Sequence, residues 1–486
     1  MKLRRIALLK IINHMKPTIK LLSALVAALV LPQLLPTAVA SAAAKPNIIY
    51  FLIDDQGYAD VGFNGSKDFL TPNIDKLAKE GTILTAMYGQ PTCSPSRSTL
   101  LTGRYPTHTG VYQTVGEKKS DNFPMPLNEK TLAQSLREAG YTTAIVGKWH
   151  LGEEPEYRPL QRGFDHQYGY MTGSISPFTQ LSANTKERDW YRDDKPVADK
   201  GYDMDLFTKE ACRLIAEQPA DKPLFLYFAP HNVHTPWQSP EADETPYGKL
   251  KGRLKQLAGT TAALDRNVGV LVKALKDKGI LDNTLIIYTS DNGGPSWNGS
   301  TQNTPLRGGK AQIYEGGMRL CSFVTWPGKV PAGVTNHEPM HLVDWYPTLL
   351  KLIGSPVNQK LPVDGMDIWP VLTAGAKTPH KEVLLMGSQV PQSAIRMGDW
   401  KLLLNPTDEK KRKGGSTASA GVKVGGDRVE LYNVVDDISE KHDLAAAQPE
   451  RVQPMIARLK ELTANPANPD HFKDTGKGAK RTQTND

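Results

Sequence analysis

Cysteine is scarce in this chain. Three cysteines, Cys93, Cys212 and Cys321, occur among 486 residues, whereas exported proteins that depend on disulfides usually carry more of them, in pairs. A disulfide framework is therefore excluded as the basis of the fold. Cys212 lies in a helical pattern and Cys321 in a strand-like run, and we expect both to be buried small apolar residues.

Acidic residues are absent from the first 40 positions. Six of the 59 basic residues lie there, so the rest of the chain carries 53 basic against 51 acidic residues, and the net charge falls from +8 to +2. A nucleic-acid-binding protein would show a basic face or stripe. The near balance of charge predicts that this protein has no nucleic-acid partner.

The N-terminal region lacks an apolar run long enough to cross a membrane. Residues 21–31 form an apolar run of eleven residues, whereas a spanning helix needs about 20. A basic stretch precedes this run and Ala38-Val39-Ala40 follows it, which is typical of a secretory signal peptide. We therefore expect residues 1–43 to be a signal peptide that starts at Met1 or Met15. The mature protein should be exported, periplasmic or secreted, and without a membrane anchor.

The main part of the chain alternates strand and helix patterns. Apolar, β-branched or aromatic runs at 48–53, 142–146, 224–228 and 285–289 predict four buried strands. Helices are predicted between them, over 130–139 and 254–278, and a glycine follows each. This alternation predicts an α/β fold in which helices flank a large, mostly parallel mixed sheet.

The pattern changes beyond about residue 378. Residues 394–404 predict strand, turn and strand, 429–433 a further strand, and 452–462 an amphipathic helix. The Lys-, Gly- and Ser-rich residues 407–428 predict a long flexible loop. Because 486 residues exceed the roughly 250–300 that one core supports, we expect a large domain over 44–378, a smaller C-terminal α+β domain over 379–465, and a disordered tail over 466–486.

Polar residues follow each of the four predicted strands. They are Asp54 and Asp55 after the first, Lys148 and His150 after the second, His231 and His234 after the third, and Asp291 and Asn292 after the fourth. Ligands of open α/β sheets bind outside the carboxyl ends of the strands, so we expect these side chains to meet. The two acidic segments offer only oxygen ligands, which suit calcium or magnesium. Each segment alone would be interpreted as a turn or a helix cap.

Cys93 precedes a predicted helix. Ser94 is a suitable N-cap, Pro95 fits the first helical turn, and Gly103 fits just past the end. Cys93 would then lie beside amides that stabilise negative charge, with Arg97 one turn away. A buried apolar cysteine and a thiolate nucleophile both remain open on these residues alone.

Cys93-Ser-Pro-Ser-Arg97, followed by Leu100-Leu-Thr-Gly-Arg104, resembles the C-x-P-x-R signature of the sulfatase family with its L-T-G-R extension. Further segments resemble that family in order, from about residue 46 to 445. They include the first strand with Asp54-Asp55, Gly147-Lys-Trp-His-Leu-Gly152, Asn232-Val-His-Thr-Pro236, Ser290-Asp-Asn-Gly293, Leu306-Arg-Gly-Gly-Lys310 and Leu431-Tyr-Asn433. The ordered series implies an alkaline-phosphatase-like α/β fold.

The resemblance also implies a mechanism. A maturation enzyme would oxidise Cys93 to formylglycine, whose hydrate attacks sulfur, and Ca²⁺ would act as a Lewis acid. The implied metal ligands are Asp54, Asp55, Cys93, Asp291 and Asn292. The implied catalytic residues are Cys93 itself, Arg97 and Lys148 for charge neutralisation, His150 for sulfate release, and His234 and Lys310 for sulfate binding and protonation of the leaving oxygen. Ser174 is an implied contact of the sulfate or of residue 93, although a Ser in a Gly-rich loop is also an ordinary turn residue.

The substrate is indicated less directly. Arg162-Gly-Phe-Asp165 and the Gly- and Tyr-rich stretch after it resemble arylsulfatases of the N-acetylgalactosamine-4-sulfatase type, which implies a sulfated carbohydrate. We expect the segments 153–205, 235–253 and 295–306 to set specificity. His166 and Trp237 are further candidates for the substrate pocket, with Trp237 equally a candidate core residue.

Two other functions remain open. Phosphonate and phosphodiester hydrolases of the same superfamily can share the cysteine signature, and they would prefer aryl phosphodiesters to aryl sulfates. A non-catalytic protein that binds sulfated glycans should have lost the cysteine or a metal ligand. This chain has kept all of them.

Overall fold

The computed structural model describes residues 45–116, 124–296, 299–388, 392–406 and 422–467. The predicted signal peptide, and all of the predicted tail except residues 466 and 467, lie outside the described residues. The chain from Pro46 onward forms one compact unit. Within the described part, no helix combines the length and the apolar character needed to cross a membrane.

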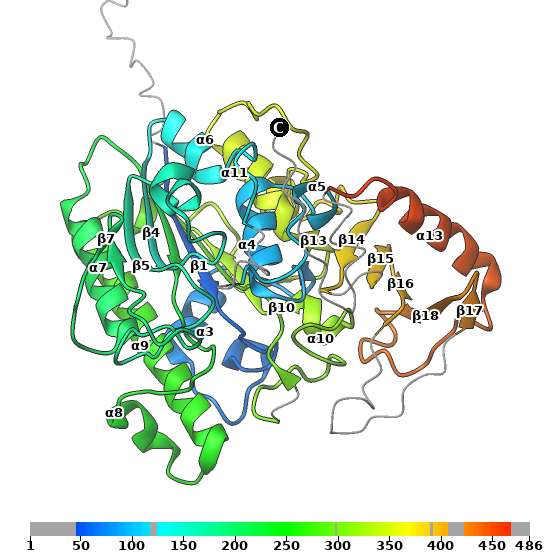
Figure 1. Ribbon diagram of the computed structural model, residues 1–486, viewed down its shortest axis with the longest axis horizontal. Coiled ribbons are helices and arrows are strands. Elements are labelled where there is room, and N and C mark those ends of the chain that lie inside the picture. Colours follow the sequence, from blue (N-terminus) through cyan, green and yellow to red (C-terminus); the bar gives the residue numbers. More distant parts are fainter. Residues whose placement is uncertain (1–44, 117–123, 297–298, 389–391, 407–421, 468–486) are drawn as a thin grey trace, which may run out of the picture. The chain divides into compact units, whose positions relative to one another are not determined.

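A ten-stranded mixed sheet runs through this unit (Figure 1). Its order is β12-β2-β11-β9-β1-β8-β4-β5-β6-β7, and the five strands from β9 to β5 are parallel. All four predicted strands are present, each within two residues of its expected bounds. The strands are β1 (Asn47–Ile53), β2 (Thr82–Leu84), β4 (Thr142–Lys148), β5 (His166–Tyr170), β6 (Tyr191–Arg192), β7 (Lys195–Pro196), β8 (Leu224–Ala229), β9 (Thr284–Ser290), β11 (Ser322–Thr325) and β12 (Val334–Asn336).

Helices cover both faces of this sheet (Figure 1). Ile48 and Tyr50 of β1 pack on one side and Ile49 and Phe51 on the other. Burial on both faces explains why the central strands are continuous apolar runs. α4 (Cys93–Thr102), α6 (Leu132–Glu138) and α11 (Trp345–Leu352) belong to the first core, and α3 (Pro72–Lys79), α7 (Asp203–Glu217) and α9 (Gly252–Lys278) to the second. Shorter helices are α5 (Pro106–Thr109), α8 (Glu241–Glu244), α10 (Glu315–Met318) and α12 (Trp369–Ala374).

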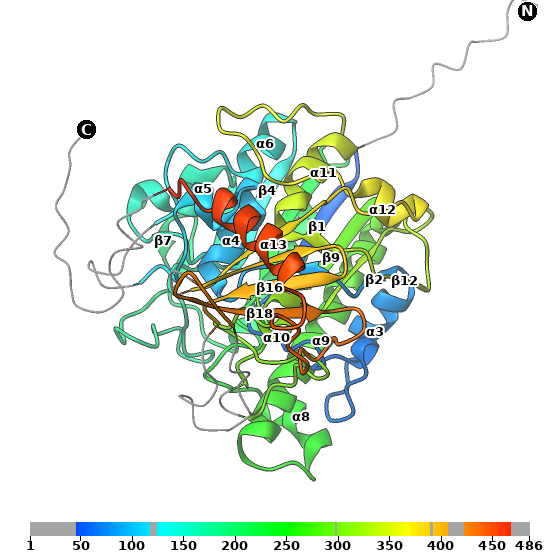
Figure 2. The same cartoon turned by 90° about the vertical axis from the view of Figure 1, so that its right-hand side faces the viewer.

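The C-terminal part is an antiparallel sheet covered by one helix (Figure 2). Its strands, in spatial order, are β14 (Val383–Met386), β15 (Ser393–Met397), β16 (Trp400–Leu404), β18 (Asp427–Asn433) and β17 (Val422–Val424), and the helix is α13 (Pro449–Leu462). A three-stranded sheet, β10 (Arg319–Leu320), β3 (Met87–Tyr88) and β13 (Met340–His341), lies in the main part. Tyr88, Tyr314 and Met318 share a core with Leu403 and Tyr432. The segment just after Lys310 therefore packs directly on the C-terminal sheet, and a domain boundary at residue 378 stays a prediction.

Two local expectations are wrong. Thr92, not Ser94, occupies the N-cap position of α4, and its side chain makes no capping hydrogen bond. Ser94 lies inside the helix, where its hydroxyl donates to the carbonyl of His150 at 2.8 Å and accepts from the amide of Val115 at 2.9 Å. The predicted loop 407–428 is also too long at its C-terminal end. Residues 422–428 form β17 and a hairpin turn into β18, while 407–421 lie outside the described residues.

Candidate active site

Four neighbouring parallel strands end at one place and bring the predicted residues together. Along the order β9, β1, β8, β4, the carboxyl ends carry Asp291 and Asn292, then Asp54 and Asp55, then His231 and His234, then Lys148 and His150. α4 adds Cys93 and Arg97, and the segment before α10 adds Lys310. The site therefore arises because the strands run parallel and end at the same edge of the sheet. The sequence predicted this parallel direction.

Cys93 is the first residue of α4 and is buried. Its Sγ donates to Asp54 Oδ1 at 3.3 Å, and Lys310 Nζ lies 3.5 Å from the same sulfur. Burial, with Asp291 and Asp54 nearby, raises the pKa of the Cys93 thiol. The unmodified side chain is therefore a protonated thiol at neutral pH, which does not favour the thiolate-nucleophile interpretation.

Three cations pair with the three carboxylates of the site. Lys148 Nζ donates to Asp54 Oδ2 at 2.6 Å, Lys310 Nζ to Asp55 Oδ2 at 2.7 Å, and Arg97 Nη2 to Asp291 Oδ2 at 2.8 Å. All six side chains are buried or nearly so. Buried charges persist only when they are paired in this way.

These pairs set the protonation states of the site. Burial alone would raise the pKa of Asp54, but Lys148, His234 and Arg97 hold it well below its usual range. Burial alone would lower the pKa of Lys310, but Asp55 and Cys93 raise it. Asp54 is therefore ionised and Lys310 protonated across the neutral range.

Four side chains of the site bring ligand atoms close enough together to hold a metal ion. Asp54, Asp55, Cys93 and His234 each place one ligand atom within 4.8 Å of the others. Asn292 Nδ2 donates to Asp55 Oδ1 at 2.7 Å, which leaves Asn292 Oδ1 buried without a hydrogen-bond partner. An unsatisfied buried oxygen needs an explanation. The amide of Asn292 contacts the carboxylate of Asp55, and amide and carboxylate oxygens are the ligands that calcium and magnesium take.

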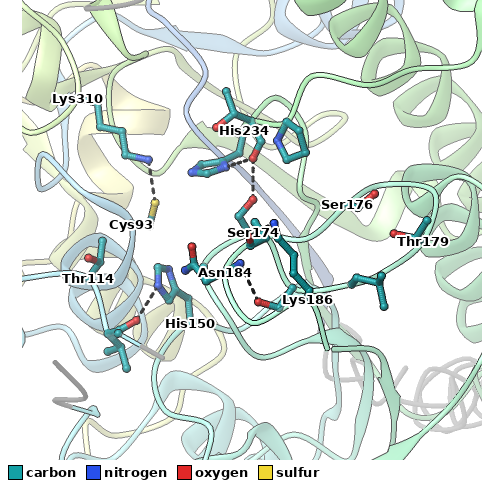
Figure 3. Close-up of a pocket in the computed structure, with 18 residues that line it drawn as sticks. Cys93, Thr114, His150, Ser174, Ser176, Thr179, Asn184, Lys186, His234 and Lys310 are labelled. Atoms are coloured by element: carbon teal, nitrogen blue, oxygen red, sulfur yellow. Dashed lines mark hydrogen bonds between the residues drawn. The ribbon is translucent and has the colours of Figure 1, made fainter. Parts of the chain in front are cut away.

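His150 and His234 both line the cavity as neutral imidazoles (Figure 3). His150 Nε2 donates to the carbonyl of Val115 at 3.0 Å, so Nδ1, which has no partner, carries the lone pair. His234 Nδ1 donates to the carbonyl of Thr235 at 2.6 Å, and its Nε2 lies 3.5 Å from Asp55 Oδ2. Burial lowers the pKa of both, aided by Lys148 at His150 and by Lys310 at His234. Each ring can therefore accept a proton.

Ser174 lines the same cavity, and His231 lies behind it. Ser174 Oγ donates to the carbonyl of Thr235 at 2.7 Å and lies 3.3 Å from His231 Nε2. His231 is buried, and burial, with His234 nearby, lowers its pKa to about 3. His231 therefore supports the loops of Ser174 and His234 and does not face the cavity.

Neither His166 nor Trp237 belongs to the pocket, so both pocket expectations are wrong. His166 begins β5, at the opposite end from the site, and contacts Asp193 and Arg213. The Trp237 side chain is buried in the core, where its Nε1 donates to the carbonyl of Val233 at 2.8 Å.

The cavity has a volume of about 640 Å³ and is lined by 18 residues (Figure 3). The sequence did not single out several of the polar ones, namely Thr114, Ser176, Thr179, Ser182, Asn184 and Lys186. All but Thr114 lie in segment 153–205, which was expected to set specificity. Thr114 carried no recognisable pattern, and among the described residues segment 295–306 contributes nothing to this lining.

Comparison with known proteins agrees with this geometry. The profile of the Sulfatase family matches residues 46–355. Mouse arylsulfatase J is 34% identical over 470 residues, covering 88% of this chain and 77% of that protein. Mouse N-acetylgalactosamine-6-sulfatase is 34% identical over 386 residues, covering 74% of this chain and 72% of that protein.

Solved structures show the same relationship. The crystal structure of Ps i-CgsB is 36% identical with a TM-score of 0.78, covering 89% of this chain and 95% of that chain. The phosphonate monoester hydrolase of Agrobacterium radiobacter, 17% identical with a TM-score of 0.59 and covering 88% of this chain and 96% of that chain, is similar in fold alone. The chain therefore belongs to the sulfatase family and is a sulfuric ester hydrolase.

Proposed function

We propose that this sulfatase hydrolyses sulfate esters of carbohydrates, with Cys93 converted to formylglycine and with calcium in the oxygen-rich site. The observation that carries the proposal is the lining of the cavity. Cys93, Lys310 and two imidazoles line it together with hydroxyl and amide side chains, which suit the hydroxyl groups of a sugar. One relative is named N-acetylgalactosamine-6-sulfatase, and i-CgsB has also been solved in complex with k-i-k-neocarrahexaose.

The chain supplies both the ligands for calcium and the residue that becomes formylglycine. Asp54, Asp55, Asp291, Asn292 and residue 93 would hold calcium, and the unpartnered Asn292 Oδ1 supports this assignment. Once present, formylglycine supplies the nucleophilic hydroxyl and calcium polarises the sulfate. Because Cys93 is buried in the folded chain, we propose that a maturation enzyme oxidises it before folding is complete. We also propose export, on the basic and apolar pattern of the first 40 residues.

The remaining residues handle charge and protons. Lys310 Nζ reaches both Asp55 and Cys93, so it is placed to bind a sulfate oxygen beside residue 93. Arg97 and Lys148 neutralise the negative charges of Asp291 and Asp54, with which they form ion pairs. His150 presents an unpartnered Nδ1 lone pair for the proton released at residue 93. His234, once protonated beside the anionic sulfate, gives its proton to the leaving oxygen.

Peptide mass, the activity of variants and substrate preference test the proposal. The peptide that contains residue 93, from protein made with a maturation enzyme, should be about 18 Da lighter than its thiol form, because CH₂SH becomes CHO. Cys93→Ala should be folded and inactive, while the matched Cys212→Ala stays active. The wild type should cleave aryl sulfates in preference to aryl phosphodiesters and should release sulfate from sulfated sugars. Full activity with an unmodified Cys93 would contradict the proposal.

A further inference from the structure

We infer that Lys186 makes the cavity selective for substrates that carry a second anionic group besides the sulfate ester that is cleaved. The inference rests on the proposed carbohydrate sulfatase activity and concerns a residue with no part in the chemical steps. Its basis is the charge of the cavity wall and the rigid turn that carries Lys186.

Among the described residues, the cavity wall is cationic and contains no acid. None of its 18 lining residues is Asp or Glu, and none is Phe, Tyr or Trp, so a sugar ring would find polar contacts rather than an aromatic surface on which to stack. Lys310 and Lys186 are the two lysines of the lining, and Figure 3 shows them on opposite sides of it. Cys93 lies on the Lys310 side.

The two lysines differ in their partners. Lys310 is engaged by Asp55 and Cys93. The Lys186 Nζ donates to the carbonyl of Ala183, and no ion pair joins Lys186 to a carboxylate of the described residues. An ammonium group has three donors, so two remain for a ligand. A cation in a wall without acids attracts anions.

The turn that carries Lys186 is held by a compact set of backbone bonds. The Lys186 amide donates to the carbonyl of Ser182 at 3.1 Å, and the Ser182 amide donates to the carbonyl of Glu187 at 2.7 Å. Antiparallel bridges join Leu181 to Arg188 and Ile175 to Ser182. These bonds define the position of the Lys186 backbone.

The backbone conformation at residue 186 supports a functional role. Lys186 has a φ of 63°, in the left-handed region that favours glycine and is uncommon for other residues. The chain therefore places a long cationic side chain where backbone preference alone would select a smaller residue. Such positions often mark functional sites.

The turn is also tied to the reactive side of the cavity. The Ala183 amide donates to the Ser174 carbonyl at 2.9 Å, and Ser174 Oγ donates to the carbonyl of Thr235, next to His234. The position of the turn relative to the sulfate-binding groups is thus set by the protein. A cavity of about 640 Å³ has room for more than the reacting sulfate, since ligand pockets span roughly 300–1,000 Å³. The second group would be a sulfate or a carboxylate on the same or the next sugar.

Binding to an inactive variant tests the inference without depending on turnover. In the Cys93→Ala background, calorimetry would compare N-acetylgalactosamine 6-sulfate with its 4,6-disulfate, and neocarrabiose monosulfate with its disulfate. A third comparison tests a carboxylate as the second anion, with a 6-sulfated N-acetylgalactosamine that is linked to a uronate. We expect about tenfold tighter binding of a doubly charged member, as one charge-assisted hydrogen bond provides. The comparison in which affinity increases identifies the second anion as a sulfate or a carboxylate.

Substitutions at Lys186 assign the preference. Lys186→Met should abolish it and leave affinity for the singly charged sugar unchanged, and Lys186→Arg should keep it. The matched control Lys209→Met, at an exposed lysine of α7 outside the cavity, should change neither affinity. The inference is overturned if no pair shows a preference, if Lys186→Met keeps it, or if both affinities fall equally. With Cys93 intact, wild type and Lys186→Met should cleave 4-nitrophenyl sulfate, which has no second anion, at equal rates. If the wild type did not cleave 4-nitrophenyl sulfate, the proposed sulfatase function would be overturned, and not the inference about Lys186.

Discussion

Lys401→Met removes the buried cation that joins the C-terminal sheet to the active-site segment. Lys401 belongs to β16, and its Nζ lies 2.8 Å from Glu315 and 3.0 Å from Glu440, with all three side chains fully buried. Glu315 begins α10, five residues after Lys310, and its amide donates to Glu440 Oε2 at 2.7 Å. The ion cluster therefore fixes the backbone that follows Lys310.

The cost of the substitution follows from the charges it leaves behind. Removing one partner of a buried ion pair typically costs about 3–5 kcal/mol, because the other charge stays buried without compensation. Glu315 keeps Arg319 at 3.1 Å, whereas Lys401 is the cation that pairs with Glu440. We therefore expect a loss of about 3 kcal/mol in the free energy of unfolding, near the lower end of that range.

The loss of unfolding free energy in Lys401→Met should depend on pH. Burial raises the pKa of Glu440 from 4.5 to about 7 even though Lys401 opposes the shift, so removing Lys401 raises it further. A carboxyl whose pKa is higher in the folded than in the unfolded chain destabilises the fold as pH rises between the two values. The variant should therefore be closer to wild type at about pH 5 than at about pH 8.

Urea unfolding followed by tryptophan fluorescence measures these differences. Lys423→Met, at an exposed lysine of β17 in the same sheet, is the matched control and should stay within about 0.5 kcal/mol of wild type. Adding Glu440→Gln to Lys401→Met should restore about 1 kcal/mol or more, because it removes the unpaired charge. A loss below about 1 kcal/mol for Lys401→Met, or no recovery in the double variant, would refute the reasoning.

Three further predictions concern the metal, pH and the sheet. Chelation should abolish aryl-sulfate hydrolysis and calcium should restore it, and Asp291→Asn should raise the calcium requirement by about tenfold or more; undiminished activity without metal would rule out the assigned site. Asp344, 2.8 Å from His380, raises the pKa of His380 above 6.5 despite burial. His380→Gln should therefore lose the whole stabilisation below about pH 6.5, and the loss should fade as pH rises through the raised pKa. Equal losses in urea unfolding at about pH 6 and about pH 9 would contradict this. Gly147→Ala would place Cβ 1.9 Å from the carbonyl oxygen of Ala229 at a φ of 118° and should cost about 3 kcal/mol or more, whereas Gly248→Ala, whose nearest contact is 3.9 Å, should show little change in thermal midpoint.

The central fold was predictable because both faces of its parallel strands are buried. β1 and β9 are runs of seven buried residues, and such apolar runs are visible in a sequence. β6 and β7 have two residues each and carry no such pattern, because they exist only through pairing with β5 and with each other. The Gly425-Gly426 turn lay inside a polar stretch and was missed because flexible loops share that composition.

The sequence by itself determined which polar residues stand at the ends of the strands, because the length of each apolar run sets where Asp54, Lys148, His234 and Asp291 begin. The tertiary structure alone decided how they combine. Arg97 pairs with Asp291 across 194 residues and Lys310 with Asp55 across 255, and nothing in a local pattern predicts such partners. The sequence did not single out Lys186 or Lys401, since whether a lysine faces water, a cavity or two buried carboxylates depends on chain segments that come together only on folding.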